Sequence, residues 1–168
     1  MSDEAREALL ESLVIWTWKD HTQGQDVVDA ACTALVAGLD SPALRDLAGL
    51  YPDTPHEVLR TVVDHVVAEL GLALPAGDDA LNLYVLRAQA RKVIDGGMTP
   101  RALTEWAFSH RGAHDSDEHE RFVGVLWEYE ELDDTQEPCG NGAPTHAEEA
   151  ALDARVRRMA RALLEEAA

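Results

Sequence analysis

The chain has 168 residues, and its content of 46% hydrophobic and 27% charged residues is typical of a folded globular protein. Its 14 basic residues stand against 32 acidic ones, for a formal net charge of -18. This charge excludes direct, general binding of nucleic acid and disfavours docking on an anionic membrane, because both would repel the chain. No basic and apolar leader follows Met1, and uninterrupted apolar runs reach only four residues. We therefore expect a cytoplasmic protein without a membrane span.

Apolar residues recur at helical spacing from the start of the chain. The first helix is expected over residues 3–19, with Ser2 as its cap. A second start lies at Thr22, because Gln25 follows at the spacing of a capping box. The inward faces of these two helices are expected to comprise Leu9, Leu10, Leu13, Val14, Trp16, Val27, Val28, Ala31, Leu35 and Leu39.

Three further helices are expected to begin where a hydroxyl residue precedes proline, at Ser41, Thr54 and Thr99. Proline suits the first helical position because its fixed φ fits the turn and its missing N–H is not needed there. Glu57 is expected to complete a capping box with Thr54. The many valines that follow fall on one helix face and do not alternate, so they predict a helix that ends at Gly71.

The remaining helices are expected over residues 78–94, 117–132 and 145–165. Asp78 or Asp79 is expected to cap the first of them. Thr145 begins the last with a capping-box spacing. The inward faces of these helices, and of the one that follows Thr99, are expected to include Ala80, Leu81, Tyr84, Val85, Ala88, Val93, Leu103, Trp106, Ala107, Phe122, Val123, Leu126, Trp127, Tyr129, Leu152, Val156, Met159, Leu163 and Leu164.

These elements predict an all-α fold, a single-domain bundle of about eight helices. Residues 1–134 are expected to form the main helical domain. Residues 135–144, which are rich in proline and glycine, indicate a flexible linker. The C-terminal helix, within residues 145–168, is expected to pack on the same domain.

Two cysteines are too few for a disulfide framework. Cys32 lies in an apolar helical pattern and is expected in the core, whereas Cys139 lies in the linker; a bridge between them stays open. The sequence contains no phosphate-binding glycine loop, no paired-cysteine or zinc-protease motif and no nucleophile elbow. No Glu has a His three residues later, which argues against a di-iron bundle. No catalytic residue and no cofactor is therefore expected.

Three histidines, His110, His114 and His119, lie among acidic residues, and imidazole with carboxylate can bind divalent metals. Their spacing matches no specific motif, and Gly112 breaks any common helical face. We expect a solvated acidic segment without a metal, and these histidines are only weak candidate ligands.

Negative charge is concentrated between residues 115 and 137, where ten acidic residues and one basic residue, Arg121, sum to -9. Three interpretations stay open: a solubilising face, internal pairing with arginines of the last helix or with the basic end of the helix over residues 78–94, and a docking surface for a basic partner. The residues expected in such an interface are Trp127, Tyr129, Glu128, Glu130, Glu131, Asp133 and Asp134.

Three segments carry a resemblance: Ala-Leu-Arg-Asp-Leu-Ala-Gly-Leu at 43–50, Glu-Leu-Gly-Leu-Ala-Leu-Pro at 69–75, and Phe-Val-Gly-Val-Leu-Trp-Glu at 122–128. Across residues 40–133 the chain resembles a family of small all-α hypothetical proteins common in actinobacteria. The resemblance implies an all-α bacterial protein. It brings no activity, cofactor or catalytic residue to this chain.

The sequence favours a non-catalytic, acidic interaction or regulatory protein, in the manner of an immunity protein or antitoxin that neutralises a basic partner. One alternative is a small metal-dependent or ligand-binding enzyme that uses the region of His110, His114 and His119. A second alternative is a DNA mimic whose carboxylates imitate phosphates and inhibit a DNA-binding protein.

Overall fold

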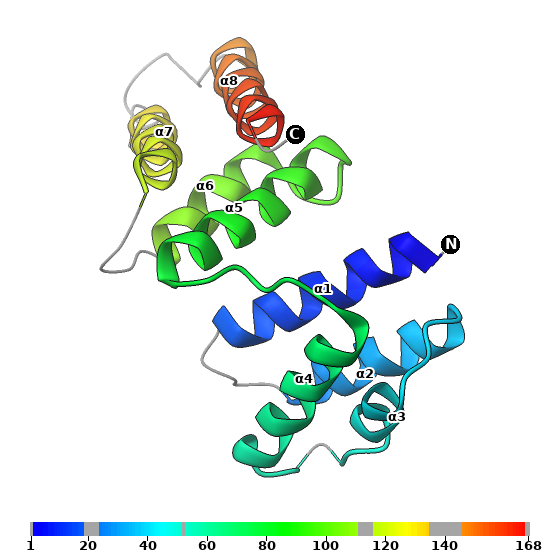
Figure 1. The fold of residues 1–168 in the computed structure, drawn as a ribbon. Helices are drawn as coiled ribbons and strands as arrows, with labels where there is room; N and C mark the ends of the chain where they lie inside the picture. The colour runs from blue at the N-terminus through cyan, green and yellow to red at the C-terminus, as the bar shows by residue number, and fades with distance from the viewer. Residues whose placement is uncertain (1, 19–23, 52, 111–115, 135–145, 167–168) are drawn as a thin grey trace. The chain divides into compact units, whose positions relative to one another are not determined.

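The computed structural model describes residues 2–18, 24–51, 53–110, 116–134 and 146–166. These residues contain eight α-helices and no strand, which confirms the all-α class (Figure 1). The helices are α1 (Ser2–Trp18), α2 (Gly24–Val36), α3 (Pro42–Ala48), α4 (His56–Leu70), α5 (Asp78–Ile94), α6 (Pro100–Ser109), α7 (Asp117–Asp134) and α8 (His146–Glu165). Within the described part of the chain, no helix is apolar over a length that could span a membrane.

Several expectations fall outside the described residues. They are the cap at Thr22, the candidate ligand His114, the cysteine Cys139, the linker over residues 135–144 and the cap at Thr145.

The chain divides into two compact units, residues 1–81 and 82–168. Each unit has its own cluster of buried apolar side chains. Leu13, Leu44 and Val66 are in the core of the first, and Leu86 and Phe122 are in the core of the second. The expectation of one main domain over residues 1–134 stays a prediction.

In the first unit, α1 packs against α2, α2 against α3, and α3 against α4. The expected apolar faces of α1 and α2 are buried or half-buried. Cys32, however, is exposed, so its expected place in the core is wrong. It follows the buried Ala31 by one residue, which turns it roughly 100° away around the helix. Its thiol lies 3.7 Å from the carbonyl oxygen of Ala48.

Helix α3 begins as expected, because the Ser41 Oγ accepts a hydrogen bond of 3.1 Å from the amide of Leu44. The expected cap at Thr54 is wrong. Pro55 has extended backbone angles (φ -54°, ψ 137°) and itself occupies the cap position of α4, without a side-chain hydrogen bond. Thr54 therefore lies outside the helix, where its amide donates to the carbonyl of Tyr51.

Gly71 ends α4 in the left-handed conformation (φ 59°), as the sequence predicted. The amide of Leu72 then reaches back 2.9 Å to the carbonyl of Val67, which is the Schellman arrangement. The carbonyl of Gly71 accepts a hydrogen bond of 2.8 Å from Arg6 on α1. The end of α4 is thereby tied to the first helix.

In the second unit, α6 packs against both α7 and α8, and α7 also packs against α8. The predicted cap of α6 is present, since the Thr99 Oγ1 accepts from the amide of Ala102 at 3.2 Å. Helix α5 supplies Leu86, Ala90 and Val93 to the core.

Two expectations for α5 are wrong at its first turn. The helix begins at Asp78, so Asp78 and Asp79 both lie inside it and neither caps it. The first backbone bond joins the amide of Leu81 to the carbonyl of Gly77, which places Gly77 at the cap position. Ala80, expected on the inward face, is exposed in this first turn.

Candidate functional site

The sequence placed Trp127 on the buried face of α7, and this is wrong: its side chain is 48% exposed. The buried residues of α7 include Phe122, Leu126 and Tyr129. Trp127 follows Leu126 by one residue and is therefore turned roughly 100° away from it. The indole consequently lies at the surface of the second unit.

Three carboxylates share the side of α7 that carries Trp127. Glu130, Glu131 and Asp134 follow Trp127 at spacings of three, four and seven residues, which place them along one side of a helix. All three are exposed, and none forms an ion pair with another described residue.

An aromatic neighbour from α6 completes this surface. The rings of Phe108 and Trp127 pack edge to face, with centroids 5.5 Å apart and an angle of 83° between their planes. Phe108 is itself 41% exposed. We call Phe108, Trp127, Glu130, Glu131 and Asp134 the α7 surface.

Tyr129, the other expected aromatic anchor, does not belong to the α7 surface, because it is only 1% exposed. Its hydroxyl group donates a hydrogen bond of 2.8 Å to Asp153 on α8, and the guanidinium of Arg101 lies 5.5 Å from its ring centre. Burial, and then the hydrogen bond to Asp153, raise the pKa of Tyr129 well above its usual value. Tyr129 is therefore a core residue, and its expected role in an interface is wrong.

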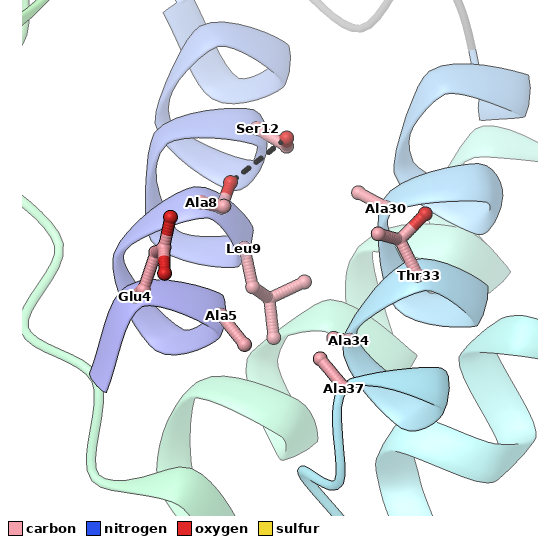
Figure 2. A pocket seen from close by; sticks show the side chains of 9 residues that line it. All are labelled: Glu4, Ala5, Ala8, Leu9, Ser12, Ala30, Thr33, Ala34 and Ala37. Atoms are coloured by element: carbon pink, nitrogen blue, oxygen red, sulfur yellow. Dashed lines mark hydrogen bonds between the residues drawn. The ribbon is translucent and has the colours of Figure 1, made fainter. Parts of the chain in front are cut away.

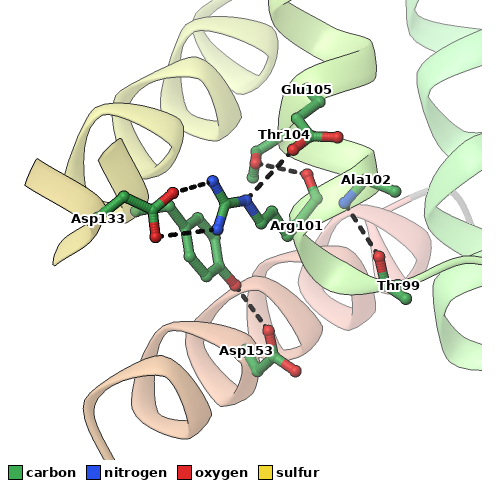
Figure 3. Close-up of polar contacts among 8 residues, drawn as sticks. Thr99, Arg101, Ala102, Thr104, Glu105, Asp133 and Asp153 are labelled. Atoms are coloured by element: carbon green, nitrogen blue, oxygen red, sulfur yellow. Dashed lines mark hydrogen bonds and ion pairs between the residues drawn. The ribbon is translucent and has the colours of Figure 1, made fainter. Parts of the chain in front are cut away.

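Two of the expected interface acids are paired within the chain. Arg155 of α8 donates to both oxygens of Glu128, at 2.6 and 2.7 Å. Asp133 binds the guanidinium of Arg101, which also contacts Glu105 (Figure 3). The hydrogen bond from Arg101 lowers the pKa of Asp133 below its usual value. Internal pairing thus accounts for these two acids, while Glu130, Glu131 and Asp134 stay outside it.

Two of the candidate histidines, His110 and His119, are directed at backbone carbonyls. His119 is 3% exposed, and its Nε2 lies 2.7 Å from the carbonyl oxygen of Ala107. Since a carbonyl only accepts, that nitrogen carries the proton and cannot bind a metal. The Nδ1 of His110 lies 2.9 Å from the carbonyl of Trp106, and its ring stacks on the indole. Within the described residues, no group of three or more His, Cys, Asp or Glu side chains could hold a metal ion.

A concave region lies between α1 and α2 in the first unit, with a volume of about 330 Å³ (Figure 2). Alanines dominate its walls, and Glu4 is its one charged lining residue. This region carries no signal in the sequence, because alanines are expected in any helix of this chain. Its lining supplies packing space and no set of catalytic groups.

Comparison with protein-family models, curated proteins and solved structures found no match for this chain. The resemblance to the actinobacterial family therefore stays a prediction.

Proposed function

We propose that this protein is a non-catalytic interaction protein that binds a basic protein partner through the α7 surface. The observation that carries the proposal is the exposed pair of Phe108 and Trp127 beside three carboxylates that no described residue neutralises. Aromatic anchors surrounded by a polar rim are common in protein interfaces.

The requirements of folding do not account for this arrangement. Glu130, Glu131 and Asp134 lie in the last turns of α7, where the helix dipole disfavours negative charge. Exposing Trp127 also forgoes the free energy that burial of an indole would contribute. A partner that covers the indole and neutralises the carboxylates would remove both costs.

The chemistry of the surface selects a partner that is rich in arginine or lysine. A guanidinium can stack on the indole of Trp127 while it donates hydrogen bonds to Glu130 or Glu131, one helical turn away. The net charge of -18 would speed the first encounter. An immunity or antitoxin role toward a basic toxin is the specific form of this proposal.

The two alternatives find less support. An enzyme site around the histidines would need imidazole nitrogens that His119 and His110 direct at carbonyls. A DNA mimic would rely on a long array of free carboxylates. Within the acidic segment over residues 115–137, however, Glu128 and Asp133 are paired with arginines. The exposed aromatic pair favours a protein partner over both alternatives.

Affinity capture from the native lysate tests the proposal with two charge-matched variants. E130Q/E131Q/D134N removes the three carboxylates of the α7 surface, and E7Q/D26N/D64N removes three exposed acids of the first unit. Both variants change the net charge from -18 to -15, because each loses three negative charges. We expect one basic protein to be retained by the wild type and by the second variant, and lost from the first and from W127A. Retention of the same protein by all four would contradict the proposal.

A further inference from the structure

The second unit also contains a concavity of about 510 Å³, and no residue of the α7 surface lines it. It is bounded by the end of α5, by the turn at Gly96 and Gly97, by the start of α6 and by one side of α8. This volume is within the range that small-molecule sites occupy. Its lining is apolar on the side of α5 and α6, through Val93, Ile94, Met98 and Pro100.

The wall that α8 contributes to this cavity is charged. Asp153, Arg157 and Arg161 lie four residues apart in turn, so all three occupy one side of the helix. Both carboxylate oxygens of Asp153 have partners. One accepts a hydrogen bond of 2.8 Å from the Tyr129 hydroxyl, and the other lies 3.4 Å from the guanidinium of Arg157. The wall therefore carries a net charge of +1 in a chain of -18.

Arg161 differs from Arg157 within this wall. It makes no ion pair with a described residue, which is also true of Arg158 on the same helix, but of these two only Arg161 lines the cavity. By contrast, Arg101 and Arg155 each bind a carboxylate of α7. Two cations one helical turn apart, such as Arg157 and Arg161, repel each other unless an anion lies between them.

We propose that this cavity binds a small organic anion, in which a phosphate or carboxylate group is joined to a compact apolar body. The anionic group would accept hydrogen bonds from the guanidiniums of Arg157 and Arg161. The apolar body would lie against Val93, Met98 and Pro100. Gly96, also in the lining, adopts φ 80°, and an added Cβ there would meet no atom within 4 Å. Such a ligand site is independent of the partner proposed above.

Titration calorimetry with phenyl phosphate and with benzoate tests this proposal and separates the two anionic groups. Inorganic phosphate at the same ionic strength measures what the apolar body adds. The variant is R161Q, and the matched control is R158Q, which removes the same charge from an exposed arginine of α8 that does not line the cavity. Both positions are exposed, so we expect both variants to keep the wild-type helical content.

We expect at least one of the two aromatic anions to bind saturably, and inorganic phosphate to bind more weakly than that anion. R161Q should raise the dissociation constant of the aromatic anion about tenfold, which is the effect of losing one charge-assisted hydrogen bond. R158Q should leave this constant unchanged. In an amide NMR spectrum the ligand should shift the signals of Gly96 and Gly97. The proposal would be overturned if neither aromatic anion bound saturably, or if R161Q and R158Q weakened binding of the anion equally.

Discussion

The hydroxyl group of Tyr129 links α7 to α8 through Asp153, whose side chain is mostly buried. Removing this hydroxyl leaves a carboxylate with one hydrogen-bond donor fewer. We expect Y129F to lower the free energy of unfolding by about 1–3 kcal/mol. Urea denaturation measures the change, and Y51F, at an exposed tyrosine of the first unit, is the control. Equal losses in the two variants would show that the hydrogen bond to Asp153 contributes nothing.

Glu69, at the end of α4, accepts a hydrogen bond of 2.9 Å from the amide of Ala43 in the first turn of α3. This bond, and then one from the Ser41 hydroxyl, lower the pKa of Glu69 below the ordinary 4.5. A carboxyl whose pKa is lower in the folded state stabilises the fold above the unfolded pKa. That stabilisation is lost as pH falls through the folded value.

We therefore expect the wild type to lose thermal stability relative to E69Q as the pH falls from about 5 to about 3. Glutamine can still accept the Ala43 amide but does not titrate, so it removes this pH-dependent contribution. Melting temperatures of both proteins across this pH window provide the measurement. Parallel curves for the two proteins would contradict the assignment of this hydrogen bond.

At the scale of single helices, two glycines provide opposite tests of backbone conformation. Gly71 has φ 59°, a region in which an L-residue is strained, while Gly124 lies inside α7 with nothing within 4 Å of an added Cβ. We expect G71A to cost about 1–2 kcal/mol and G124A to add about 0.5–1 kcal/mol of stability. Chemical denaturation distinguishes the two signs. A stabilising G71A would refute the described end of α4.

The sequence predicted where most helices begin and end, because local chemistry decides those points. Ser41, Thr99 and Gly71 act through backbone atoms within a few residues of themselves. The predicted cap at Thr54 is wrong for an equally local reason. A Thr-Pro pair is compatible with a helix that begins at the proline or one residue after it, and the backbone angles of Pro55 give the second start, at His56.

The outward face of α7 could not be predicted in the same way. Six of the eight residues from Phe122 to Tyr129 are apolar, so they cover more than one side of the helix and periodicity does not rank them. Packing against α6 and α8 buries Tyr129 and leaves Trp127 exposed. The sequence thus indicated the segment that carries the candidate site, whereas tertiary packing determines which residues of that segment face outward.

At the scale of the whole molecule, ion pairing between distant segments could not be predicted either. Arg101 meets Asp133 and Arg155 meets Glu128 across 32 and 27 residues of sequence. In the described part of the acidic run over residues 115–137, Glu128 and Asp133 are paired with arginines, whereas Glu130, Glu131 and Asp134 form no ion pair. Sequence reveals the excess of charge, and only the fold shows which charges are neutralised.

The two separate cores predict that each unit folds by itself. Fragments 1–76 and 77–168, cut in the segment before α5, should each give a helical circular dichroism spectrum and a cooperative thermal transition. The full chain is the reference. Fragments that remain unfolded would instead support the single main domain expected from the sequence.

We propose that the α7 surface, and not total charge, brings a basic partner to this protein. Stopped-flow or surface-plasmon measurements of the association rate constant, across a range of salt concentrations, test it with the partner retained by affinity capture. At low salt we expect E130Q/E131Q/D134N to associate about five- to tenfold more slowly than the wild type, with a weaker salt dependence.

E7Q/D26N/D64N has the same net charge of -15 and should keep the wild-type rate. The first variant should also keep or gain stability, because it removes negative charge from the last turns of α7. Equal association rates for the two variants at every salt concentration would contradict the account, since total charge alone would then explain binding.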